Sequence, residues 1–153
     1  MTRIMFVCHG NICRSPMAEF IFRKLASERG CAAKYTVASS ATSDEEIFGG
    51  VGNPVYPPAQ RILLQNGIDP KGKRAVRLTS ADGDKYDLFV GMDEANIRNM
   101  KRILKGCDGK IIKLLDLIGG GDVADPWYTG NFDLTYRNIV DGCTALLDHL
   151  ENQ

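Results

Sequence analysis

The chain has 153 residues and alternates short apolar runs with segments in which apolar residues recur at helical spacing. The apolar runs predict four buried strands, at residues 3–8, 35–38, 86–90 and 110–114. The helical spacing predicts helices over residues 16–29, 58–66, 93–104 and 134–150, with Ser15 as the N-cap of the first. This alternation predicts a single α/β domain over residues 1–153, in which helices cover both faces of a four-stranded parallel sheet.

Two long segments do not fit this alternation. Residues 39–57 are rich in Gly, Ser, Pro and acidic residues, and residues 119–131 contain a Gly-Gly-Gly-Asp run followed by Asp125-Pro126-Trp127-Tyr128. Long loops in compact domains are often functional, and parallel sheets bind ligands beyond the carboxyl ends of their strands. We interpret Asp44-Glu45-Glu46 as a solvated acidic loop, with selection of peptide substrates by charge as the alternative.

Charge and cysteine content narrow the class of protein. Nineteen Lys and Arg balance nineteen Asp and Glu, so the basic excess of a nucleic-acid-binding protein is lacking and an anion has to be bound locally. No apolar run approaches the ~20 residues of a membrane helix, and the N-terminal apolar stretch is too short for a signal peptide. Five cysteines suit free thiols better than a disulfide framework. We expect a cytoplasmic protein without a membrane or nucleic-acid partner.

The candidate chemistry lies between the first predicted strand and the first predicted helix. This loop reads Cys8-His9-Gly10-Asn11-Ile12-Cys13-Arg14-Ser15-Pro16. A short loop that turns into a helix N-terminus directs backbone N–H groups into one concavity, where the helix dipole adds positive potential. The planar fork of Arg14 can hold two phosphate oxygens, and Gly10 permits a backbone conformation forbidden to other residues. The same field favours the thiolate of Cys8, which predicts a nucleophile facing a bound phosphate.

Other interpretations of these residues exist. Cys8 and Cys13 could be metal ligands, but without a second Cys/His cluster they make a poor zinc site, so we expect no metal. Asp125-Pro126 alone is typical of a turn, and only the cysteine motif favours a catalytic acid there. Trp127 and Tyr128 could anchor the loop in the core, and Phe48 could be a chance exposed aromatic residue.

Two motifs together resemble one family. The run from Val7 to Pro16 and the run from Asp125 to Tyr128 closely resemble the low-molecular-weight protein tyrosine phosphatases, and the match extends over nearly the whole chain. The resemblance implies hydrolysis of phosphotyrosine in proteins, and of small aryl phosphates, without a cofactor. It assigns Cys8 as the carrier of a phosphocysteine intermediate, Arg14 as the transition-state clamp and Asp125 as the general acid.

The resemblance also implies finer roles. The phosphate-binding residues are His9, Gly10, Asn11, Ile12, Cys13 and Arg14. Asn11, Ser15 and Ser39 support the loop, Cys13 can form a reversible disulfide with the nucleophile, and Phe48, Trp127 and Tyr128 wall the pocket. Two positions depart from the family: Lys73 stands where a histidine often joins the hydrogen-bond network of the loop, and His9 replaces a small or aliphatic residue.

Two alternative functions share parts of this pattern. Thiol-dependent arsenate reductases share the fold and the Cys-x5-Arg loop, but they need further cysteines as a relay, and this chain has none between Cys31 and Cys107. A phosphate- or phosphopeptide-binding relative without turnover is the second alternative. The presence of both Cys8 and Asp125 favours the enzyme.

Overall fold

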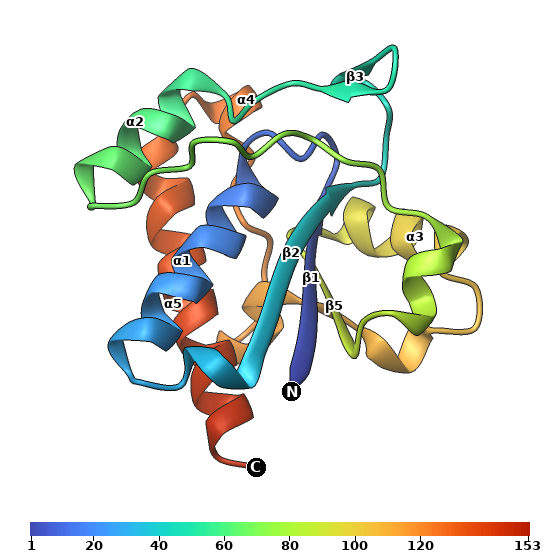
Figure 1. Cartoon of the computed structure of the whole chain (residues 1–153), viewed down its shortest axis with the longest axis vertical. Helices are drawn as coiled ribbons and strands as arrows, with labels where there is room; N and C mark the ends of the chain where they lie inside the picture. The colour runs from blue at the N-terminus through green and yellow to red at the C-terminus, as the bar shows by residue number, and fades with distance from the viewer.

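Four parallel strands form the central sheet of the computed structural model, which describes residues 1–153 (Figure 1). Their order is β2-β1-β5-β6, and every neighbouring pair is parallel. The strands are β1 (Thr2–Cys8), β2 (Tyr35–Ala41), β5 (Leu88–Gly91) and β6 (Ile111–Lys113). The predicted four-stranded parallel sheet is therefore confirmed, and all four carboxyl ends lie at one edge of it.

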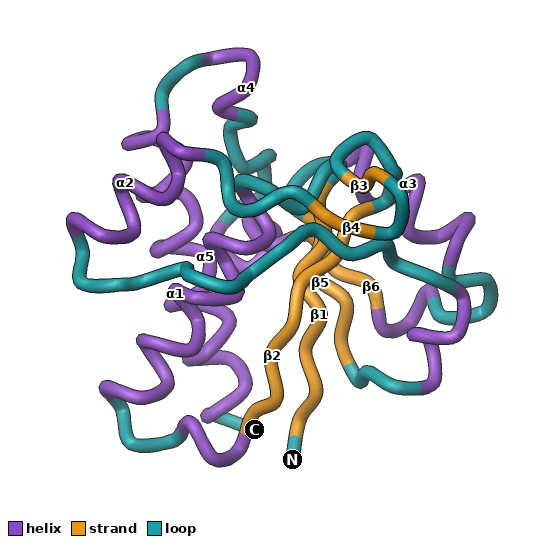
Figure 2. Tube along the Cα trace, turned by 45° about the horizontal axis from the view of Figure 1, so that its top comes forward, coloured by secondary structure: helices purple, strands orange, loops and turns teal.

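Helices cover both faces of the sheet, as predicted (Figures 1 and 2). The helices on one face are α1 (Arg14–Glu28), α2 (Pro57–Gln65) and α5 (Phe132–Glu151), whereas α3 (Glu94–Ile103) covers the other face. Side chains alternate along β1, because a strand points successive residues to opposite faces. Phe6 and Cys8 accordingly lie in the larger apolar core, and Met5 and Val7 lie in the smaller one under α3.

Shorter elements connect these layers. They are the hairpin strands β3 (Ile47–Phe48) and β4 (Val51–Gly52), the four-residue helix α4 (Pro126–Thr129), and 3₁₀ segments at Ala32–Lys34, Ser80–Asp84, Asp108–Lys110 and Leu114–Ile118. None of the helices is both long and apolar enough to span a bilayer.

The predicted loop over residues 39–57 is partly wrong. β2 continues to Ala41 because its last residues pair with the end of β1, where Ala41 lies opposite Cys8. The β3–β4 hairpin follows, and its turn places Gly49 and Gly50 at φ values of 57° and 79°. Two consecutive residues with positive φ form the type I′ turn of short hairpins, so the Gly-Gly pair was a usable signal in the sequence.

The predicted start of the first helix also needs correction. α1 begins at Arg14 with Cys13 at its N-cap position, rather than after Ser15. The Ser15 side chain is turned toward the Cys8 sulfur instead of capping the helix. The cap predicted for α3 is confirmed, because Asp93 accepts a hydrogen bond from the backbone N–H of Asn96 at 2.8 Å.

The segments that follow the strands meet at one end of the molecule. The loop after β1, the β3–β4 hairpin and α4 lie at this end, whereas both chain termini lie at the other (Figures 1 and 2). The fold therefore brings the Cys8 loop and the Asp125 segment to the same edge of the sheet, where parallel sheets bind ligands.

Candidate active site

The loop between β1 and α1 curls around the sulfur of Cys8. The backbone N–H of Asn11 donates to Cys8 Sγ at 3.3 Å, and Ser15 Oγ lies 3.0 Å from the same sulfur. Asn11 has a φ of 59°, in the left-handed region that asparagine tolerates better than most residues. The special backbone conformation expected at Gly10 is therefore carried by Asn11. At Gly10 a Cβ atom would lie 3.2 Å from Glu46 Cγ, a tight contact that the Glu46 side chain would have to relieve by a small shift.

A chain of hydrogen bonds in the buried interior ends on the nucleophile. The Asn11 amide nitrogen donates to Ser15 Oγ at 2.7 Å and to Ser39 Oγ at 2.9 Å, and its oxygen accepts from the backbone N–H of Val76 at 3.1 Å. Since the Ser15 oxygen already accepts from Asn11, its single proton has two acceptors within reach, Cys8 Sγ at 3.0 Å and the backbone oxygen of Ser40 at 3.5 Å, and Cys8 is the nearer. A hydroxyl donor at this position stabilises a thiolate, and the predicted loop-supporting residues lie together.

A buried carboxylate anchors the other end of this chain. Ser39 Oγ donates to Glu19 Oε1 at 2.6 Å, although Glu19 lies on α1 and is only 5% exposed. Arg23 pairs with the second carboxylate oxygen at 2.6 Å, which balances the buried charge. Glu19 had no signal in the sequence, because one acidic residue on an amphipathic helix is ordinarily solvated.

Lys73 joins the same network. Its ammonium donates to the backbone oxygen of Ser39 at 3.0 Å and lies 3.7 Å from Glu19 Oε1. Burial lowers the Lys73 pKa, and the nearby Glu19 carboxylate opposes that shift. Lys73 therefore holds the end of β2 next to the Cys8 loop. A lysine at this position, where the family often has histidine, still supports the loop through its hydrogen bond to Ser39.

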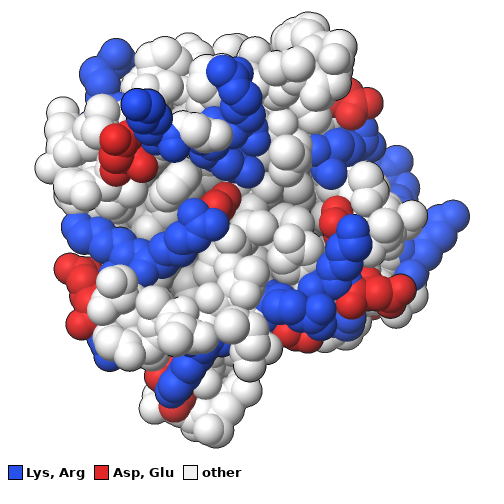
Figure 3. Space-filling model, viewed as in Figure 1, with Lys and Arg blue, Asp and Glu red and all other residues white.

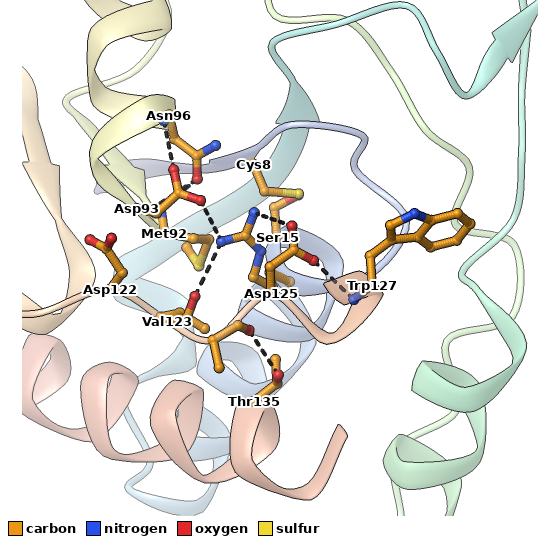
Figure 4. Close-up of polar contacts among 12 residues, drawn as sticks. Cys8, Ser15, Met92, Asp93, Asn96, Asp122, Val123, Asp125, Trp127 and Thr135 are labelled. Atoms are coloured by element: carbon orange, nitrogen blue, oxygen red, sulfur yellow. Dashed lines mark hydrogen bonds and ion pairs between the residues drawn. The ribbon is translucent and has the colours of Figure 1, made fainter. Parts of the chain in front are cut away.

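The Arg14 guanidinium is held from two sides. Its Nη1 donates to Asp93 Oδ2 at 2.8 Å and to the backbone oxygen of Val123 at 3.2 Å, and Nη2 lies 3.4 Å from Asp125 Oδ2. Figure 4 shows Asp93, Val123 and Asp125 around one position beside Cys8. The Arg14 side chain is 4% exposed, so its orientation is fixed by these partners and not by solvent.

The contacts of Arg14 leave one edge for a ligand. Nε makes no hydrogen bond within the protein, and the Nη2 contact with Asp125 is long, so the Nε–Nη2 edge can bind two oxygens of an anion. Burial by itself lowers the Arg14 pKa, but Cys8, Asp93 and Asp125 outweigh it and raise that pKa. The guanidinium is therefore a permanent cation beside the thiol.

Asp125 is both a helix cap and a site residue. Its Oδ1 accepts from the backbone N–H of Trp127 at 3.0 Å, which caps α4, while Oδ2 faces Arg14. The carboxylate side chain is 31% exposed. A turn and a catalytic acid are alternative interpretations of Asp125-Pro126 in the sequence, but in the structure one carboxyl group caps α4 through Oδ1 and presents Oδ2 to Arg14.

A hollow of about 200 Å³ opens over the Cys8 loop. It is lined by Cys8, His9, Gly10, Asn11, Ile12, Cys13, Arg14, Glu45, Glu46, Asp125, Trp127 and Tyr128. All six residues predicted to bind phosphate line this hollow, as do the three predicted catalytic residues. The sequence motifs at the two ends of the chain thus meet in one place.

The predicted aromatic walls are only partly found. Trp127 and Tyr128 line the hollow and are 62% and 86% exposed, and the Trp127 ring centroid lies 5.3 Å from that of Tyr56, which sequence reasoning missed. Phe48 does not line the hollow, because it lies in the β3–β4 hairpin with 66% of its surface exposed. The acidic residues Glu45 and Glu46 line it from that segment instead.

His9 contacts Glu45 at the mouth of the hollow. Its Nε2 lies 3.0 Å from Glu45 Oε1, and both side chains are at least half exposed. His9, which stands where the family often has a small or aliphatic residue, therefore links the Cys8 loop to the acidic segment that follows β2.

The other cysteines lie away from the nucleophile. Only Cys8 and Cys13 line the hollow, and Cys31 and Cys143 are buried in the core between the sheet, α1 and α5. Burial, together with Cys8 and Asp125, raises the pKa of Cys13 to about 12, so Cys13 is a neutral thiol. Beyond Cys13, no further cysteine lines the hollow to continue the thiol relay that arsenate reduction requires.

Asp93 was predicted only as a helix cap, and its contact with Arg14 gives a separate test. Asp93 uses one carboxylate oxygen to cap α3 and the other to accept from Arg14, and asparagine replaces one of these oxygens with an NH2 donor, so one of the two contacts is lost. We expect Asp93→Asn to lower kcat for p-nitrophenyl phosphate by about 10- to 100-fold, because Arg14 loses its fixed orientation. Since asparagine is an equally good N-cap, the unfolding temperature should stay close to that of the wild type. A wild-type kcat in a folded variant would contradict the orienting role.

Comparisons with known proteins agree with this geometry. Low molecular weight protein-tyrosine-phosphatase YfkJ of Bacillus subtilis is 38% identical over 159 residues, which cover 100% of this chain and 98% of that protein. Its crystal structure matches with a TM-score of 0.92 over 99% of this chain and 96% of that chain. The human low molecular weight phosphotyrosine protein phosphatase is 36% identical, with 95% of this chain and 93% of that protein covered.

The match to the family as a whole is equally extensive. Residues 3–153 match the family described as low molecular weight phosphotyrosine protein phosphatase. The resemblance found in the two motifs is thereby confirmed, and the two alternative functions are not favoured. The chain, with its Cys8 loop and Asp125 in one hollow, belongs to the low molecular weight phosphotyrosine protein phosphatase family and is a hydrolase of this class.

Proposed function

We propose that this protein hydrolyses phosphotyrosine in proteins through a phosphocysteine on Cys8. The Cys8 sulfur attacks phosphorus, an S–P bond forms, and the bond from phosphorus to the phenolic oxygen breaks. Asp125 gives its proton to the departing oxygen, so tyrosine leaves as the neutral phenol. Arg14 and the backbone N–H groups of the loop hold the three remaining phosphoryl oxygens throughout.

The second step restores the enzyme. Asp125, now a carboxylate, takes a proton from a water molecule whose oxygen attacks phosphorus. The S–P bond breaks, inorganic phosphate leaves, and Cys8 returns as a thiolate that the Ser15 hydroxyl and the Asn11 N–H stabilise. The same carboxyl group serves both steps because it lies on the open side of the hollow.

One observation carries this proposal: a thiol, a buried guanidinium and a partly exposed carboxyl group converge from two ends of the chain on one hollow. Trp127 adds an aromatic wall, which favours an aryl phosphate through stacking. We also propose a cytoplasmic location, because all five cysteines are free thiols and Cys8 has to stay reduced to act.

Two measurements test the mechanism. The wild-type protein should hydrolyse both p-nitrophenyl phosphate and a phosphotyrosine peptide. For each substrate, a metal chelator should leave the rate unchanged. A phosphotyrosine peptide labelled with radioactive phosphorus is mixed with the enzyme, and the reaction is stopped rapidly with acid. After digestion of the enzyme, the label should be found on the fragment that contains Cys8. Release of dephosphorylated peptide within the first catalytic cycle, without any label on Cys8, would rule out the covalent intermediate.

The role proposed for Cys13 predicts reversible oxidation. Mild peroxide converts a cysteine thiolate to a sulfenic acid, and a neighbouring thiol can trap this species as a disulfide before further oxidation. We expect a dithiol reductant to restore most of the activity of peroxide-treated wild type and far less of the activity of Cys13→Ser. Equal recovery of the two proteins would remove the protective role from Cys13, and Cys107→Ser, which changes a thiol away from the hollow, is the matched control.

A further inference from the structure

A second hollow adjoins the active site and has no role in the proposed reaction. It measures about 340 Å³, and His9 lines both it and the active-site hollow. Polar and basic residues dominate its walls, namely His9, Thr42, Ser43, Arg77, Asn99 and Arg102. Two backbone hydrogen bonds, from Thr42 to Cys8 at 3.0 Å and from Ser43 to His9 at 3.1 Å, fix it to the nucleophile loop.

The two arginines give this hollow a positive charge that is available to a ligand. Arg102 on α3 bonds to the neutral side chain of Asn99 and makes no ion pair with a carboxylate. Arg77 pairs with Asp44 at 2.7 Å, but the Asp44 side chain is 74% exposed. Such a surface pair contributes little stability, so another oxyanion can replace Asp44 at small cost. Figure 3 shows Lys and Arg side chains, interspersed with Asp and Glu, over much of the face of the molecule that Figure 1 presents.

A buried hydroxyl in the same wall lacks a partner. Thr42 is 7% exposed, and its Oγ1 is buried without any hydrogen bond. A buried polar atom in this state is unfavourable, and Thr42 is one of the residues that line the hollow. The charge and the unpartnered hydroxyl both indicate a polar, anionic occupant.

We propose that this second hollow is an anion subsite for the substrate, and the proposal rests on the phosphotyrosine phosphatase activity proposed above. With the phosphotyrosine seated over Cys8, the neighbouring residues of a peptide leave the active site past His9. An oxyanion on one of them, either a carboxylate or a second phosphoryl group, reaches Arg102 and Arg77. Acidic sequence next to the phosphotyrosine therefore raises kcat/KM, because the subsite adds charge-assisted hydrogen bonds.

The test compares peptides that differ only beside the phosphotyrosine. One peptide carries neutral flanking residues, one carries glutamate on either side, and one carries phosphoserine on either side. We expect wild type to prefer both acidic peptides by about tenfold in kcat/KM, the size typical of one charged contact. If the phosphoserine peptide is hydrolysed faster than the glutamate peptide, a phosphoryl group is the better occupant. If these two acidic peptides react at the same rate, and both faster than the neutral peptide, the subsite accepts either oxyanion.

Two variants separate the subsite from the general field of the protein. Arg102→Gln should reduce the acidic preference to about twofold or less, whereas Lys101→Gln, which removes the same charge from an exposed position of α3 outside the hollow, should keep it. Both should hydrolyse p-nitrophenyl phosphate, which has no flanking residue, at the wild-type rate. Equal losses in the two variants would show long-range attraction and overturn the subsite.

The outcome for wild type distinguishes the two proposals. Hydrolysis of all peptides at one rate would overturn the subsite and leave the phosphatase activity intact. Failure to hydrolyse p-nitrophenyl phosphate and the neutral peptide would contradict the proposed function. In that case the affinities of the same peptides, measured by fluorescence anisotropy, still test the subsite, since equal affinities for acidic and neutral peptides would overturn it.

Discussion

Cys8→Ser should lose hydrolysis by at least about 10⁴-fold, because a serine hydroxyl stays protonated at neutral pH and is a weak nucleophile. Binding of orthovanadate should survive within about tenfold, because the loop N–H groups and Arg14 form the anion cradle without the sulfur. The hydroxyl can still accept from the Asn11 N–H, so the loop should keep its shape. Initial rates with p-nitrophenyl phosphate and calorimetric titration with vanadate give the two quantities.

The matched control for this substitution is Cys107→Ser. Cys107 is a partly buried thiol outside the active-site hollow, so its replacement should leave kcat/KM at the wild-type value. Residual hydrolysis above about one per cent in Cys8→Ser, with the substitution verified by mass spectrometry, would contradict covalent catalysis. Loss of vanadate binding together with activity would instead show that the sulfur is needed to shape the cradle.

Asp125→Asn should slow phosphotyrosine hydrolysis by about 10²- to 10⁴-fold, the range typical of a lost general acid. Asparagine is a good N-cap, so it can keep the hydrogen bond from the Trp127 N–H and with it the start of α4. A proton donor matters most for a poor leaving group, so p-nitrophenyl phosphate should be affected considerably less. The two substrates have to be compared by their rates of phosphoenzyme formation, measured by rapid mixing. Steady-state rates would also contain the second step, in which Asp125→Asn removes the base.

Asp122→Asn provides the control in the same loop. Asp122 pairs with Lys113 at 3.0 Å and does not line the active-site hollow, so this variant should keep both rates within about twofold. If Asp125→Asn slows both esters by the same factor in phosphoenzyme formation, Asp125 shapes the loop and another group donates the proton.

Much of the fold could be predicted from local patterns in the sequence. The apolar runs and the helical periodicity predicted the parallel sheet and the helices on both faces, because alternation of this kind has few compact solutions. The ends of elements were less accurate where long-range pairing decides them. β2 extends to Ala41 only because β1 lies beside it and supplies hydrogen-bond partners.

The site divides in the same way. Cys8, Arg14 and the loop between them are contiguous, so the order of the residues alone places a thiol, backbone N–H groups and a guanidinium around one anion. The Ser15 hydroxyl lies against the Cys8 sulfur instead of capping α1, and the sequence could not separate the two uses because both begin from the same position. Phe48 could not be placed, since the exposure of a loop residue depends on how its hairpin folds.

The sequence by itself determined the order of the elements and the chemistry of the nucleophile loop. Tertiary structure decided which distant groups act on that loop: Asp93 and Asp125, 79 and 111 residues from Arg14, reach its guanidinium only because parallel strands end at one edge. Glu19 and Lys73 meet at Ser39 because α1 and the loop that holds Lys73 both pack against β2. Contacts of this kind depend on the packing of whole elements, which no local preference of the residues encodes.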